Sequence, residues 1–223
     1  MRSHRNAPPP GESLEEKLLM DLRATRTAVS PVDPLPLEDV MWDLRVDSED
    51  DAESVRRYLL GSADWMEERT GYALRPGSYQ VLLDGWWQPG PVQIMKGPLR
   101  HPEELVIECM ELGVAGWQPL PLSGYRVSEE PRSFRIYWRE GVTFPTLEPG
   151  GQTVRIRFDA GYDPPGSTQS ESSGSGLIMP DGMKSALTAI TAFMYQKKVA
   201  GRDTLRFANV ELDPVLQQYR QFW

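Results

Sequence analysis

Apolar positions recur at steps of three and four in two long segments, and this spacing predicts two amphipathic helices. The first lies at residues 50–70, and its stripe consists of Val55, Tyr58, Leu59, Ser62 and Met66. The second lies at residues 181–200, and its stripe consists of Met183, Leu187, Ile190 and Met194. A shorter helix at residues 37–44 precedes the 50–70 helix. Gly71 follows the last turn of the 50–70 helix, where it favours a left-handed C-cap. We expect these three helices to form a small bundle.

Acidic residues mark the turn that leads into the 50–70 helix. Asp47 or Ser48 is suited to an N-cap, and Asp50 or Asp51 lies three residues further on, as in a capping box. Glu49 adds a further negative charge where the helix dipole is positive. The pattern therefore predicts side-chain capping at this turn.

Between the helices the apolar pattern changes to a period of two, which is typical of half-buried strands. Six short segments show it, at residues 79–83, 91–95, 105–110, 124–127, 134–138 and 154–158. The pair Asp84-Gly85 is a turn signal after the first of them. Short strands at this spacing predict a small antiparallel sheet or sandwich, with the arginines of the last two strands solvated or paired with carboxylates.

The combined pattern predicts an α+β fold in which a helical bundle carries an inserted antiparallel β-rich region. The bundle is assigned to residues 36–74 and 177–201, and the insertion to residues 75–162. Residues 163–176 are rich in serine and glycine and are expected to form a flexible linker. We expect extended arms at both ends of the chain.

The N-terminal arm is assigned to residues 1–35. A capping box at residues 13–16 and leucines at helical spacing predict a short amphipathic helix that includes Leu22, and a proline-rich linker follows it. The arm is either a floppy tail or a segment that packs on a neighbouring subunit.

The C-terminal tail, residues 202–223, carries many large apolar side chains for a terminus. They are Leu205, Phe207, Val210, Leu212, Leu216, Tyr219, Phe222 and Trp223. Because termini fray unless they are docked, such a tail either folds back on its own domain or anchors a partner.

Charge adds to this picture because nearly all of the net −8 is concentrated in one segment. Residues 36–71 contain eleven acidic and four basic side chains, a difference of seven. Such a surface repels DNA and anionic membranes, although DNA can pass along it without binding. The absence of a secretory signal and of a long apolar run predicts a soluble protein, and the single cysteine, Cys109, excludes an intrachain disulfide.

Catalytic chemistry has little support in the sequence. The two histidines, His4 and His101, and the lone Cys109 provide neither metal-ligand spacing nor a nucleophile and base, so we expect no cofactor, no metal and no enzymatic activity. Adjacent carboxylates such as Glu67-Glu68 are expected on the surface. Trp86-Trp87 can form a sugar-stacking platform, but covering a sheet edge or filling an interface is the favoured interpretation.

Several short motifs, taken in order, resemble the phage head–tail connector (adaptor) proteins, in particular the phiE125 gp8-like branch of the HK97 gp6-like adaptors, which is also found in gene transfer agents. The motifs are LEDV at 37–40, LRVD at 44–47, ADWMEERTGYAL at 63–74, YQVLLDGW at 79–86, GPL at 97–99, YRV at 125–127 and VRIRFDAGY at 154–162. The likeness covers roughly residues 36–200. The first 35 residues have no counterpart in it, and the linker at 166–176 is longer than the family pattern.

This resemblance implies a structural protein of the virion neck that is assembled in the host cytoplasm. Such adaptors form a ring of neighbouring subunits, typically a dodecamer, which binds the portal, meets a tail-side stopper or connector, and lets DNA pass without specific binding. The C-terminal tail would then bind the portal through the apolar side chains given above. We expect Asp47, Glu49, Asp50 and Asp51 to line the DNA channel.

Two other function classes remain open on the sequence alone. One is a carbohydrate- or protein-binding module that uses exposed tryptophans at positions 86, 87 and 117. The other is a hydrolase whose carboxylates are brought together only by the fold, which requires two facing carboxyls with raised pKa in a pocket.

Overall fold

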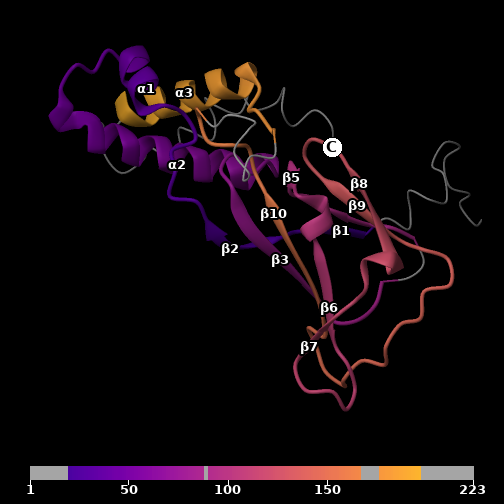
Figure 1. Ribbon diagram of the computed structural model, residues 1–223. Coiled ribbons are helices and arrows are strands. Elements are labelled where there is room, and N and C mark those ends of the chain that lie inside the picture. The colour runs from indigo at the N-terminus through magenta and orange to yellow at the C-terminus, as the bar shows by residue number, and fades with distance from the viewer. Residues whose placement is uncertain (1–19, 88–89, 167–175, 197–223) are drawn as a thin grey trace, which may run out of the picture.

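The computed structural model describes residues 20–87, 90–166 and 176–196. Two β-sheets pack face to face, and three helices form a layer at one end of them (Figure 1). The predicted α+β class is confirmed at this level. The expected helical bundle with an inserted β region is not a clear description, because the β-structure makes up most of the described elements.

The smaller sheet has the strand order β1-β4-β9-β8. Its strands are β1 (Met20–Leu22), β4 (Val92–Ile94), β8 (Tyr125–Glu129) and β9 (Phe134–Trp138). β4 pairs with β9 and β9 with β8 in antiparallel register, whereas β1 pairs with β4 in parallel.

The larger sheet has the strand order β2-β3-β10-β6-β7, and β5 also pairs with β10. Its strands are β2 (Thr25–Val29), β3 (Gly77–Leu83), β5 (Leu99–Arg100), β6 (Val106–Met110), β7 (Trp117–Pro119) and β10 (Val154–Ala160). All of its pairings are antiparallel. β10 lies at the centre and alternates buried and more exposed positions, as the period-two pattern predicts.

The core of the β region lies between the two sheets. Val92, Ile94 and Ile136 of the smaller sheet and Val154 and Ile156 of the larger one are fully buried. An edge-to-face contact between the rings of Phe134 and Phe158, with centroids 4.7 Å apart, joins the two sheets. Cys109 is buried in the same core, which agrees with its expected role as a small apolar residue.

The helical layer consists of α1 (Leu37–Leu44), α2 (Ala52–Thr70) and α3 (Asp181–Gln196). The helix bounds that the sequence marks most clearly are confirmed. α1 covers residues 37–44, and Gly71 caps the C-terminus of α2 with a φ of 76°. The predicted stripes face inward: Val55, Leu59 and Met66 of α2 are fully buried, and so are Leu187 and Ile190 of α3.

The end of α3 lies beside the first half of α2. The rings of Tyr58 and Tyr195 meet edge to face at 5.9 Å, and the Ser62 hydroxyl lies 3.3 Å from the Met194 sulfur. α1 packs on both helices, and its inward side chain Val40 is 1% exposed. The three helices therefore bury a core of their own.

The expected capping box is not formed. Neither Ser48 nor Asp51 makes a side-chain capping hydrogen bond; a 3-10 turn at Glu49–Asp51 leads into α2 instead. The backbone amide of Asp51 donates to the carbonyl oxygen of Ser48 at 3.1 Å. The backbone thus satisfies an amide that the side chains were expected to satisfy.

The N-terminal prediction is wrong where it falls on described residues. The end of the predicted helix, Met20–Leu22, forms β1, and Thr25–Val29 forms β2; these strands pair with β4 and β3 of the same chain. Leu35, at the end of the proposed arm, is buried in the helical core. Residues 20–35 are therefore part of the folded unit, because distant strands supply backbone partners that the local pattern does not show. Residues 1–19 lie outside the described part.

Asp163, the first residue of the proposed linker at 163–176, is held by the fold. The Asp163 carboxylate accepts a hydrogen bond from Arg100 at 2.5 Å and another from the backbone amide of Leu177 at 3.1 Å. This carboxylate clamps together the two segments that flank residues 167–175, which lie outside the described residues.

Candidate functional site

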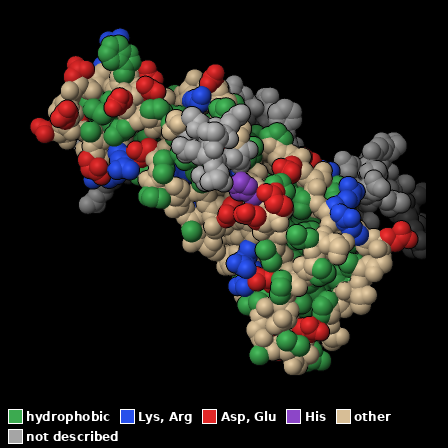
Figure 2. Space-filling model, viewed as in Figure 1, with side chains coloured by type: hydrophobic (Ala, Val, Ile, Leu, Met, Phe, Trp, Pro, Cys, Tyr) green, Lys and Arg blue, Asp and Glu red, His purple; other side chains and the backbone are tan. Residues whose placement is uncertain are grey.

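The outer end of the helical layer is a strongly acidic surface. Figure 2 shows acidic side chains gathered at the end that α1 and the start of α2 form in Figure 1. The exposed carboxylates there are Glu38, Asp39, Asp43, Asp47, Glu49, Asp50 and Glu53. Asp51 is half-buried. The structure thus brings the four proposed channel-lining residues together in one turn between α1 and α2.

Trp42 is the unexpected feature of this acidic surface. Its side chain is 82% exposed, the largest exposed fraction among the large apolar residues described. It lies on the side of α1 that faces away from Val40, and the exposed carboxylates Glu38 and Asp39, four and three residues earlier, are its neighbours on the helix surface. Sequence analysis missed Trp42, although a tryptophan on the polar face of an amphipathic helix was a visible signal.

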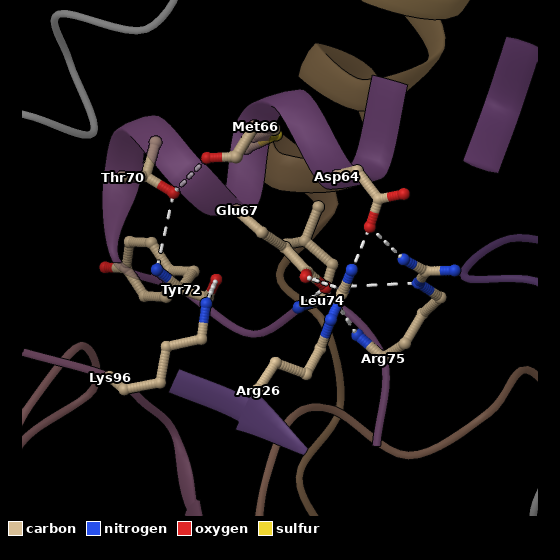
Figure 3. A network of polar contacts seen from close by, with 9 residues as sticks. All are labelled: Arg26, Asp64, Met66, Glu67, Thr70, Tyr72, Leu74, Arg75 and Lys96. Atoms are coloured by element: carbon tan, nitrogen blue, oxygen red, sulfur yellow. Dashed lines mark hydrogen bonds and ion pairs between the residues drawn. The ribbon is translucent and has the colours of Figure 1, made fainter. Parts of the chain in front are cut away.

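A buried polar network joins the inner end of α2 to the sheets (Figure 3). Glu67 of α2 is 4% exposed, and its Oε1 accepts hydrogen bonds from the backbone amides of Leu74 at 2.8 Å and Arg75 at 3.3 Å. Its Oε2 accepts a hydrogen bond from Arg26 of β2 at 3.0 Å. One carboxylate therefore fixes the chain that leaves α2 and the edge strand beside it.

Asp64, one turn before Glu67, completes the connection. Its Oδ1 accepts hydrogen bonds from Arg26 at 2.9 Å and from Arg75 at 2.6 Å. Glu67 and Arg75 are buried, whereas Asp64 and Arg26 are exposed. Because buried charges are costly unless they are paired, the pairing matters most for Glu67 and Arg75. Glu67 was expected on the surface, and that expectation is wrong; Glu68, its neighbour, is exposed.

Lys96 extends the network from the sheet side. Its ammonium donates to the carbonyl oxygen of Tyr72 at 3.0 Å and lies 5.1 Å from the ring centroid of Tyr79. Burial lowers the pKa of Lys96, and the Glu67 carboxylate nearby opposes that shift. The residues after Gly71 are thereby held on both sides.

Tight backbone packing holds the same junction. Gly161 has a φ of 125°, and a Cβ placed on it would lie 2.1 Å from the carbonyl oxygen of Arg75. Only glycine fits where the chain leaving β10 crosses the chain leaving α2.

A second buried carboxylate, Glu108 of β6, lies on the larger sheet. It accepts hydrogen bonds from Arg157 at 2.7 and 2.9 Å and from Arg155 at 2.9 Å. Burial raises the pKa of Glu108, but these hydrogen bonds outweigh burial, so its pKa is lowered overall. The arginines of β10 are thus paired with a carboxylate, one of the two outcomes expected from the sequence.

The tryptophans proposed as a binding platform lie mainly in the core. Trp87 is 4% exposed and stacks on Trp138 with centroids 4.2 Å apart, and the half-buried Trp86 contacts Trp138 and Phe144. Trp117 is half-buried beneath the guanidinium of Arg155 at 4.3 Å. The proposed platform of exposed tryptophans is therefore wrong, because Trp87 is buried and Trp86 and Trp117 are half-buried against other side chains.

A pocket of about 510 Å³ lies between α1, α3 and the chain segments on either side of residues 167–175. Prolines and aliphatic groups line most of it, with Asp39, Asp43 and Lys184 among its polar residues. Within the described ranges, no group of three or more His, Cys, Asp or Glu side chains could hold a metal ion. Among the same residues, no helix has the length and apolar character to cross a membrane.

The proposed portal-binding residues of the tail, positions 205–223, lie outside the described residues, so their role stays a prediction.

Comparison of the fold with solved structures finds similar chains in gene transfer agent particles. One comes from the neck of an empty particle computed with C6 symmetry, with a TM-score of 0.60, 18% identity, and coverage of 78% of this chain and 83% of that one. A second comes from the virion of a native particle, with a TM-score of 0.59, 19% identity, and coverage of 78% and 84%. A third comes from the neck of a native particle computed with C12 symmetry, with a TM-score of 0.54, 18% identity, and coverage of 77% and 83%.

No protein-family model and no curated protein sequence matches the chain. At 18–19% identity, the likeness to the gene transfer agent chains shows a shared fold.

Proposed function

We propose that this chain is a structural head–tail adaptor of a tailed phage or phage-like particle. Copies assemble in the host cytoplasm into a ring, a dodecamer, that sits under the portal in the virion neck, extends the DNA channel and meets a tail-side stopper or connector. The observation that carries the proposal is the shared fold with chains from the necks of gene transfer agent particles. The ordered motifs in the sequence agree with it independently.

The acidic outer end suits a channel wall. Exposed carboxylates at Asp47, Glu49 and Asp50, with the half-buried Asp51, repel the phosphates of DNA, so DNA slides past them without binding. In the proposed ring these four residues face the channel.

The proposal gives the C-terminal tail the role of portal anchor. The apolar side chains from Leu205 to Trp223 are the contact residues, since aromatic and aliphatic anchors dominate interface energetics. α3 ends at Gln196, and the proposed anchor residues lie beyond it, outside the described part of the chain.

The experiment that tests the adaptor role is negative-stain electron microscopy of the candidate portal mixed with this chain. The full-length chain and a chain cut after Gly201 are compared. An extra ring on the portal with the full-length chain alone supports both the adaptor role and the anchor. Rings with both chains keep the role but reject the anchor, and no ring with either chain rejects the adaptor role.

The channel role has a separate test. Replacement of Asp47, Asp50 and Asp51 by lysine is expected to slow DNA passage without preventing ring assembly, because lysines bind phosphates. Ejection of DNA at the normal rate by particles that carry this variant would rule out the channel role.

A further inference from the structure

Resting on the proposed ring, the structure points to the surfaces by which neighbouring copies meet. We propose that the exposed face of α1, centred on Trp42, binds the outer face of the β8–β9 hairpin of the next copy. The helix face consists of Glu38, Asp39 and Trp42. The sheet face consists of Arg126, Arg135, Tyr137 and Arg139.

The helix face has the chemistry of a guanidinium site. Trp42 is 82% exposed, and an indole left in water at this level favours a contact that covers it. The carboxylates of Glu38 and Asp39 lie one turn before Trp42 on the same helix, and neither forms an ion pair within the described part of the chain. An arginine can stack on the indole and pair with these carboxylates at the same time.

The sheet face supplies such arginines. Arg126 is exposed and lies opposite Tyr137 in the β8–β9 pairing, with its guanidinium 4.1 Å from the ring centroid. Arg135 lies on the same side of β9 as Tyr137, because alternate residues of a strand share a face, and the exposed Arg139 follows the strand directly. Stacking holds the Arg126 guanidinium in place, which reduces the entropy lost when it binds a partner.

Charge on the sheet face is partly unsatisfied. Arg135 pairs with Glu130 at 3.3 Å, whereas Arg126 and Arg139 form no ion pair with any residue that the structure describes. Arg139 donates instead to the carbonyl oxygen of Tyr125 at 3.1 Å. The two free positive charges are the complement of the carboxylates on the helix face.

The two faces lie at opposite ends of the molecule, which permits a head-to-tail contact. Figure 1 places α1 and the β8–β9 hairpin at opposite sides, and Figure 2 shows acidic side chains over the first and basic side chains near the second. Two helix faces would repel each other, so a symmetric pair through this surface is disfavoured. A head-to-tail contact repeats from copy to copy. It closes into a ring if the rotation between successive copies adds up to a full turn.

The test uses two surface variants of the full chain. The helix-face variant carries Trp42→Ala and Glu38→Lys, and the sheet-face variant carries Arg126→Glu. Glu103→Lys and Arg57→Glu are the charge-matched controls, since both side chains are exposed and lie outside the two faces. Sedimentation velocity up to millimolar concentration measures self-association, and circular dichroism checks that each variant is folded.

We expect each variant to weaken self-association by about tenfold or more, as loss of an interface hot spot does. The controls should associate as the wild type does, and added salt should weaken the wild-type contact. An equal mixture of the two variants provides the sharper result. The helix-face variant retains a sheet face and the sheet-face variant retains a helix face, so together they should form a dimer that grows no further.

Three outcomes overturn the proposal: a wild-type chain that stays monomeric at millimolar concentration, variants that associate like the wild type, or a mixture that forms no dimer. The adaptor role is judged separately by portal decoration in the microscope. Full rings on the portal with both variants would keep the adaptor role and reject this contact, whereas a heterodimer without any portal ring would keep the contact and reject the adaptor role.

Discussion

The two ends of the α2 region use the same residue types in opposite ways. At the inner end, Glu67 and Asp64 are tied to Arg26 and Arg75 by hydrogen bonds of 2.6 to 3.0 Å. At the outer end, carboxylates such as Asp47 and Asp50 are exposed and form no ion pair within the described residues. The inner charges join the helices to the sheets, and the outer charges are available to something outside the chain.

The comparison shows that the partners supplied by the fold, and not residue type, decide what a carboxylate does here. Glu67 is buried among its partners, and Asp64 is exposed but still pairs with Arg26 and Arg75. A buried charge that loses its partner costs several kcal/mol, whereas an exposed one is solvated and contributes little. The inner network is therefore expected to be essential for folding, and the outer acidic surface is expected to tolerate change in the isolated chain.

Removal of Glu67 is the most direct way to break the inner network. Glu67→Ala leaves Arg26 with one partner fewer and removes the acceptor for the amides of Leu74 and Arg75. We expect the free energy of unfolding to fall by about 3 kcal/mol. Urea denaturation followed by circular dichroism measures this loss.

The matched control is Glu68→Ala, which removes the same group one residue further along the helix at an exposed position. Its effect should stay within about 0.5 kcal/mol. Equal losses for Glu67→Ala and Glu68→Ala would show that the inner network does not stabilise the fold.

Two glycines test how tightly the same junction is packed. At Gly161 the added methyl group of Gly161→Ala would lie 2.1 Å from the Arg75 carbonyl oxygen, at a φ of 125°. This change should lower the free energy of unfolding by more than about 2 kcal/mol.

Gly61 of α2 has open space around it, so Gly61→Ala should raise the free energy of unfolding by about 0.5 to 1 kcal/mol through helix propensity. Thermal unfolding of Gly161→Ala and Gly61→Ala under identical conditions shows whether the two changes in the free energy of unfolding have opposite signs. A stabilising Gly161→Ala would mean that the junction is looser than described.

Local signals account for the parts of the fold that the sequence predicts well. α1 has the expected bounds, Gly71 ends α2, and β9 covers the alternating segment 134–138. Each of these depends on residues within one or two turns of the feature. The alternation in β10 was equally visible because its buried and exposed positions belong to one short stretch.

The failures concern partners that are distant in sequence. β1 pairs in parallel with residues 92–94, and no local pattern in residues 20–22 indicates that partner. The network around Glu67 needs Arg26, which lies 41 residues earlier, so Glu67 could not be told from Glu68 by sequence alone. Trp42 is different, since its polar helical surroundings were visible and its exposure could have been predicted.

The pair formed by Glu108 and the arginines of β10 predicts an acid-sensitive contribution to stability. Because hydrogen bonds from Arg157 and Arg155 lower the pKa of Glu108 in the folded chain, its contribution is present above the ordinary glutamate pKa and is lost as the pH falls through the folded value. Glu108→Gln should lower the free energy of unfolding by about 1 to 2 kcal/mol at neutral pH.

Urea denaturation between neutral pH and pH values below the ordinary glutamate pKa measures this effect. The wild type and Glu108→Gln should approach each other in stability as Glu108 becomes protonated. A difference that stays constant over the whole range would show that the carboxylate charge does not contribute.

The smallest expected effect on stability concerns the outer end. Asp47→Asn and Asp50→Asn remove exposed charges, and each should change the free energy of unfolding by no more than about 0.5 kcal/mol. Loss of a favourable interaction with the start of α2 and relief of repulsion among neighbouring carboxylates act in opposite directions. Urea denaturation at low and high salt measures this balance, because salt screens both effects and should bring each variant closer to the wild type. A loss as large as that of Glu67→Ala would contradict the contrast between the two ends, and it would mean that the outer acidic surface stabilises the chain itself.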